Sequence, residues 1–123
     1  MEEYRNFGEY MCAMRKRRYM TIRELAEAMD VSPTFIVDVE KSRRNPFPLE
    51  KLNDLAKILQ LNDEEKQKLL NLAGKSRETV APDLPDYIMN RDYVSAALRT
   101  ARDLDAGEAE WQKFVDELRQ RKG

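Results

Sequence analysis

The sequence contains no histidine and a single cysteine, Cys12, among its 123 residues. Without histidine, Cys/His zinc sites and every mechanism that uses an imidazole as general base are excluded. A lone thiol excludes an internal disulfide and is typical of a reducing compartment. Apolar runs are only a few residues long, and the N-terminus MEEYRNFGEY is too acidic and polar for a signal peptide. We therefore expect a cytoplasmic protein with no metal, no cofactor and no membrane contact.

Charge of either sign is abundant but nearly balanced. The chain has 22 Lys and Arg against 23 Asp and Glu, a net charge of −1. Basic residues nevertheless cluster at positions 15–18 and 41–44, and local clusters matter because electrostatic attraction acts over about 8 Å at physiological salt. These clusters are candidate contacts with a polyanion, although residues 15–18 also fit a solvated helix end. No glycine-rich phosphate loop is present, and the carboxylates fall opposite apolar stripes, so we expect no enzymatic activity.

The segment 22–41, IRELAEAMDVSPTFIVDVEK, has the pattern of two short helices joined by a tight turn. Ala26 supplies a small side chain where the two helices would cross. Apolar residues recur about once per turn on the inner face of the pair: Leu25, Met29, Val31, Ile36 and Val39. Such a pair usually exists to place its second helix in DNA.

Capping residues mark the ends of these two helices. Thr21 and Glu24 have the spacing of a capping box, and Ser32 followed by Pro33 is an N-cap with proline at the first helical position. Asp30 falls in the turn, where a left-handed conformation is expected and Asp is tolerated. The boundaries therefore agree with the apolar pattern.

Three further helices are expected around this pair. A first helix covers residues 3 to about 18, and a fourth covers 49–61 after a loop that contains Pro46 and Pro48. A capping box of Asn62 and Glu65 opens a fifth helix, which Gly74 is expected to end.

The remaining two-fifths of the chain, residues 76–123, changes character. Residues 76–90 are a predicted linker between a domain at 1–75 and a helical hairpin at 91–123. The last helix is expected from Ala106 to about Arg121. It carries a narrow apolar stripe of four residues: Trp111, Phe114, Val115 and Leu118. Two helices cannot bury these residues alone, so they pack on their own chain, on a second copy or on a partner protein. We favour a homodimer, since regulators that read two half-sites are symmetric.

The run from Tyr10 to Leu61 resembles the Xre/Cro-like helix-turn-helix family, which is related to the lambda-repressor DNA-binding domain. The motifs LAEAMDVSPTFIVDVEKSRRNP and LEKLNDLAKILQL carry the likeness. It implies an all-α fold, a five-helix lambda-repressor-like DNA-binding domain with a C-terminal helical extension, and double-stranded DNA as partner. Two positions depart from the family pattern: Ile22 replaces a glutamine, and Ser42 replaces a glycine.

Matching positions in the family assign the predicted DNA contacts. Thr34 and Asp38 correspond to base-contacting positions, and the outward-facing Phe35 and Val37 are candidates for thymine contact. No Arg, Asn or Gln lies between positions 33 and 39, so direct readout of guanine or adenine by this helix is expected to be weak. Either the loop that follows supplies part of the recognition, or sequence preference depends partly on DNA shape. The predicted phosphate contacts are Thr21, Arg23, Ser32, Lys41, Arg43, Arg44 and Asn45.

These features favour a sequence-specific transcriptional regulator, a dimeric repressor with the 33–41 helix in the major groove. Two alternatives stay open from the sequence. The first is the antitoxin of a toxin–antitoxin pair, which a neighbouring toxin-like reading frame would indicate. The second is a protein-interaction adaptor that uses the fold without DNA, which the neutral charge and the apolar recognition surface favour.

Overall fold

The computed structural model describes residues 3–122. Residues 1, 2 and 123, at the outer ends of the two predicted domains, lie outside the described residues. Within the described part every regular element is a helix, which confirms the all-α prediction. The helices are α1 (Phe7–Arg17), α2 (Ile22–Met29), α3 (Pro33–Glu40), α4 (Leu49–Ile58), α5 (Asp63–Ser76), α6 (Pro85–Met89), α7 (Asp92–Asp103) and α8 (Glu108–Lys122). The chain divides into two compact units, Met1–Pro85 and Asp86–Gly123.

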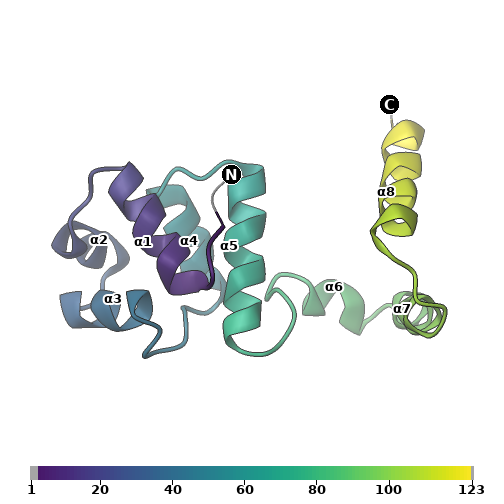
Figure 1. The fold of residues 1–123 in the computed structure, drawn as a ribbon, viewed down its shortest axis with the longest axis horizontal. Helices are drawn as coiled ribbons and strands as arrows, with labels where there is room; N and C mark the ends of the chain where they lie inside the picture. Colours follow the sequence, from purple (N-terminus) through teal and green to yellow (C-terminus); the bar gives the residue numbers. More distant parts are fainter. Residues whose placement is uncertain (1–2, 123) are drawn as a thin grey trace. The chain divides into compact units, whose positions relative to one another are not determined.

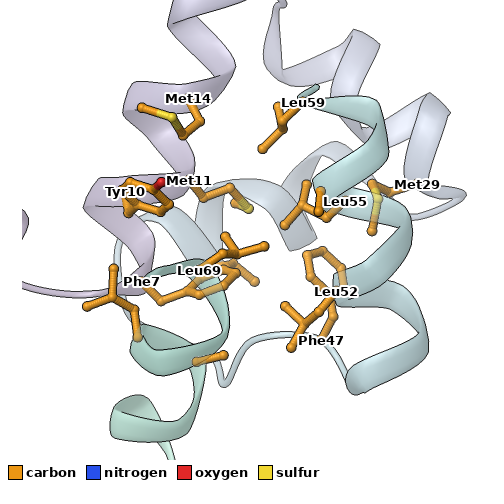
Figure 2. Packing of buried hydrophobic residues seen from close by; sticks show 14 of the residues in the cluster. Phe7, Tyr10, Met11, Met14, Met29, Phe47, Leu52, Leu55, Leu59 and Leu69 are labelled. Carbon is orange, nitrogen blue, oxygen red and sulfur yellow. The ribbon is translucent and has the colours of Figure 1, made fainter. Parts of the chain in front are cut away.

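Helices α1 to α5 enclose the hydrophobic core of the first unit. Helix α1 packs against α3 and α5, α2 packs against α3 and α4, and α4 packs against α5 (Figure 1). Each helix contributes a side chain with 0% exposure: Met11, Leu25, Ile36, Leu55 and Leu69. Figure 2 shows the labelled core side chains converging between the helices. Each such burial stabilises the fold by about 1.5–3 kcal/mol relative to an exposed side chain.

The predicted helix pair is confirmed in its core and in its caps. Ala26 is 1% exposed at the place where α2 meets α3. The Glu24 amide donates to the Thr21 hydroxyl at 3.0 Å, and the Thr21 amide donates to the Glu24 carboxylate at 2.8 Å. Asp30 adopts the left-handed conformation at φ 58° and ψ 47°, as the turn requires. The capping box of Asn62 and Glu65 is also present.

Helices in this protein end in left-handed residues that are not glycine. Ser42, which follows α3, has φ 60°. Its amide donates to the Val39 carbonyl at 3.1 Å, and the Arg43 amide donates to the Asp38 carbonyl at 2.8 Å, the two bonds of a Schellman motif. The positive-φ residues among those described are Tyr19, Asp30, Ser42, Gln60, Glu78 and Asp105. A residue with a Cβ costs about 1–2 kcal/mol in this conformation, so these turns store strain.

Three expected helix ends in the first unit are corrected. Helix α4 ends at Ile58 rather than at residue 61. Helix α1 begins at Phe7 rather than at residue 3, because the Asn6 side chain accepts from the Glu9 amide and caps the helix there. Helix α5 runs through Gly74 to Ser76. Gly74 is needed for packing instead: a Cβ on it would lie 2.6 Å from the Val80 carbonyl carbon.

The segment after α5 therefore packs on the first unit. Ala81 is buried, and the Arg77 guanidinium donates to the Pro46 carbonyl in the loop between α3 and α4. Such contacts join residues far apart in sequence. Local sequence patterns in residues 76–85 could therefore not predict them.

The second unit contains α7 and α8, which cross rather than run antiparallel (Figure 1). Helix α8 begins at Glu108, later than the expected Ala106, and the Gly107 amide donates to the Glu110 carboxylate at 2.8 Å. Between the helices lies an apolar groove of about 490 Å³. Trp111 and Phe114 line it in an edge-to-face pair with centroids 6.2 Å apart.

Among residues 3–122 no helix combines the length and the hydrophobicity that a membrane span requires.

A buried ion pair joins α1 to the end of α3. The Arg15 guanidinium donates to both carboxylate oxygens of Glu40, at 2.7 and 3.1 Å, and to the Met20 carbonyl at 2.8 Å. Both charged side chains are only 9% exposed. Hydrogen bonding to Glu40 raises the pKa of Arg15 above its ordinary value. Because each charge is desolvated, each depends on the other.

We predict that Glu40→Ala lowers the free energy of unfolding by about 3 kcal/mol, because it leaves the Arg15 charge buried without its partner. The double variant Arg15→Met with Glu40→Leu should recover most of that loss, since no charge remains unpaired. Urea denaturation monitored by circular dichroism measures both. A loss below about 1 kcal/mol in the single variant would contradict a structural role for the pair.

We predict that Ser42→Gly raises the free energy of unfolding by about 0.5–1 kcal/mol, because glycine relieves the left-handed strain at a small entropic cost. Ser42→Ala is the matched control and should change stability by less than about 0.5 kcal/mol, since it keeps the Cβ. The same denaturation series compares the two variants. A less stable glycine variant would show that Ser42 is not strained.

Candidate nucleic-acid interface

The outer face of α3 carries the residues that sequence analysis assigned to base contact. Thr34 is exposed in the first turn, while Phe35, Val37 and Asp38 are half-buried. The opposite face holds Ile36 and Val39, at 0% and 2% exposure. The core therefore fixes the rotation of α3 about its axis, and it directs the Thr34 side of the helix to solvent.

The Schellman motif turns the chain sharply at the end of α3 and sets the course of the next segment. Residues 41–48, here called the arginine loop, connect α3 to α4. Lys41, Arg43, Arg44 and Asn45 are all exposed in this loop. Three cationic side chains are thus grouped beside the C-terminal end of α3.

The arginine loop contacts the outer face of α3. The Arg43 guanidinium lies 4.0 Å from the Asp38 carboxylate. The Arg44 guanidinium lies over the Phe35 ring, 4.5 Å from its centroid, and the opposing Phe47 ring is 5.2 Å from Phe35 at an interplanar angle of 26°. Sequence reasoning missed these contacts, because no periodicity relates a helix residue to a loop residue nine positions later.

Helix N-termini supply further groups suited to an anion. Thr21 and Ser32 are exposed N-caps of α2 and α3, and the Ser32 hydroxyl accepts from the Phe35 amide at 3.1 Å. Arg23 is exposed in the first turn of α2. The free amides of a first helical turn and the positive end of the helix dipole favour phosphate oxygens.

The basic cluster at residues 15–18 divides in two, so neither interpretation made from the sequence applies to all four residues. Arg15 is buried against Glu40, as described above. Arg17 pairs with Glu65 on α5 and holds the pKa of that carboxyl below its ordinary value. Only Lys16 and Arg18 are exposed there without an ion pair among the described residues. In the arginine loop Lys41 and Arg44 are exposed in the same way, whereas Arg43 pairs with Asp38.

Comparisons with known proteins agree with this geometry. A family model described as a helix-turn-helix domain matches residues 6–69, just over half of the chain. The search of curated proteins gave no match. A solved structure described as the SinR protein/SinI protein complex is 16% identical, with a TM-score of 0.47 over 94% of this chain and 97% of that chain. The chain therefore belongs to the helix-turn-helix domain family.

Proposed function

We propose that this protein is a sequence-specific DNA-binding repressor that acts as a dimer in the cytoplasm. The observation that carries the proposal is the pairing of an exposed helix face on α3 with the cationic arginine loop at its end. A helix of this width fits the major groove of B-DNA, and adjacent cations contact the flanking phosphates. No feature of this geometry suggests a reaction at this face.

The charge distribution supports binding despite the net charge of −1. Lys41, Arg43 and Arg44 lie together at one end of α3, whereas the acidic residues 63–65 lie in the first turn of α5. Screening at physiological salt limits interactions between exposed charges to about 8 Å, so phosphates at α3 experience mainly the nearby cations. Local rather than total charge therefore sets the attraction.

We infer that base recognition by α3 is limited and that the arginine loop contributes to it. Thr34 can exchange a hydrogen bond with a base edge, Val37 can contact a thymine methyl, and Asp38 can accept from a cytosine amino group. Bidentate readers of guanine or adenine are missing from positions 33–39. DNA shape and half-site spacing would supply the rest of the specificity.

The proposed dimer forms through the second unit. Trp111, Phe114 and Leu118 are 40%, 51% and 39% exposed on α8, and the groove between α7 and α8 is lined almost entirely by apolar side chains. Exposure of a Trp and a Phe next to an apolar groove is typical of an interface. In this arrangement residues 1–75 bind DNA, 76–90 connect, and 91–123 join two copies so that two α3 helices read two half-sites.

We predict that Arg43→Ala with Arg44→Ala weakens binding to every duplex and lowers the slope of log affinity against log salt by ~2 per protomer, because two phosphate contacts no longer release counterions. Fluorescence anisotropy with random and selected duplexes measures affinity and slope.

The matched control for this pair is Lys57→Ala with Lys66→Ala, which removes the same charge at the end of α4 and in α5. That control should keep the wild-type slope to within about 0.5. An unchanged slope in the arginine variant would place the loop off the DNA. Absence of binding by the wild-type protein to any duplex would favour the adaptor alternative.

We predict that Trp111→Ala raises the dimer dissociation constant by about 30-fold, the usual effect of truncating a central aromatic anchor. Lys113→Ala, on the same helix but outside the groove lining, should leave the constant unchanged. Sedimentation equilibrium measures the dissociation constants of both variants.

A chain truncated after residue 85 keeps the whole core of the first unit and should be a folded monomer. If that truncated chain were still dimeric, the interface would lie in α1 to α5.

A further inference from the structure

The Phe35 ring on α3 contacts two side chains of the arginine loop, and these contacts are here called the stack. The ring packs against Phe47, which is 3% exposed and belongs to the hydrophobic core. The Arg44 guanidinium carbon lies over the Phe35 ring, 4.5 Å from its centroid. The buried Phe47 and the flexible Arg44 are therefore linked through Phe35.

From this geometry we infer that Phe35 is a positioning residue for DNA binding, which holds the Arg44 guanidinium on its ring so that Arg44 contacts a backbone phosphate. The inference rests on the proposed function, since it concerns how the same face engages DNA. It gives Phe35 a role through Arg44 instead of a direct thymine contact.

The chemistry of a stacked guanidinium supports this role. An aromatic face attracts the cation through its quadrupole and fixes the plane of the group. The N–H donors of a guanidinium point outward within that plane, so stacking leaves them free to donate to phosphate oxygens. A side chain that is already ordered loses less entropy on binding, and the affinity rises accordingly.

The base of the stack is anchored by long-range contacts. Pro46 and Phe47 are both buried, and the Pro46 carbonyl accepts from the Arg77 guanidinium beyond α5. Phe35 cannot turn toward a base without losing its packing on Phe47. The stack therefore keeps the Arg44 guanidinium beside the end of α3.

A double-variant cycle in the full-length protein tests the inference. Phe35→Leu keeps an apolar contact with Phe47 but removes the ring face, and it should weaken binding to a duplex about threefold to fivefold. Phe35→Tyr keeps the ring and should bind within about twofold of wild type. In an Arg44→Ala background, Phe35→Leu should have no further effect, because the group it positions is gone.

The alternatives predict different results from the same variants. A direct thymine contact would keep the Phe35→Leu loss in the Arg44→Ala background and make it depend on thymine in the site. A purely structural effect on α3 would also persist there and would lower the urea midpoint. Either result would overturn the positioning role while leaving DNA binding intact.

Failure of the proposed function itself gives a separate signature. If the wild-type protein bound no duplex, both proposals would fail, whatever the variants did.

A second measurement, by NMR, tests the stack without DNA. The Phe35 ring current should shift the Arg44 side-chain proton resonances upfield, and Phe35→Leu should abolish that shift. Unshifted Arg44 resonances in wild type would overturn the positioning role even if DNA bound.

Discussion

The position of α3 depends on the Arg15–Glu40 ion pair and on the close approach of the α1 and α3 backbones at Gly8. Glu40 is the last residue of α3, and its carboxylate is held by a buried guanidinium from α1. Near the start of α1, a Cβ on Gly8 would lie 2.6 Å from the Val39 carbonyl oxygen, so only glycine permits the backbones to approach. Together these two contacts fix the C-terminal end of α3 against the core. The arginine loop leaves from that end, and its course depends on them.

The proposed DNA surface is therefore built in order from the inside outward. Ile36 and Val39 fix the rotation of α3, and the Schellman motif at Ser42 fixes the direction of the chain that follows. The Phe35 ring, which packs on Phe47, then holds the Arg44 guanidinium at the surface. Each step restricts the motion of groups farther from the core. Groups that are already ordered lose less conformational entropy when DNA binds. The second unit would contribute by joining two such surfaces.

Much of the fold could be predicted because the signals that specify it are local. The capping box at Thr21, the left-handed Asp30 and the apolar spacing around Ala26 each involve residues within one or two helical turns, and all are present. The predictions that failed concern residues whose tertiary contacts lie outside their own helical turn. Gly74 was expected to end α5, yet the backbone of residue 80 packs against it inside the helix. Arg15 had the pattern of an exposed basic run, yet Glu40 accepts its hydrogen bonds from 25 positions away.

By itself the sequence determined α2 and α3, their inner face and the helix-turn-helix family, because helical periodicity, capping spacing and turn residues depend only on neighbouring positions. Tertiary structure decided which polar side chains are free to act. It buried Arg15, paired Arg17 with Glu65, and placed Arg44 on Phe35. The physical reason is that hydrogen bonds, ion pairs and ring contacts depend on distances of a few ångströms between elements, and those distances are set only when the core packs.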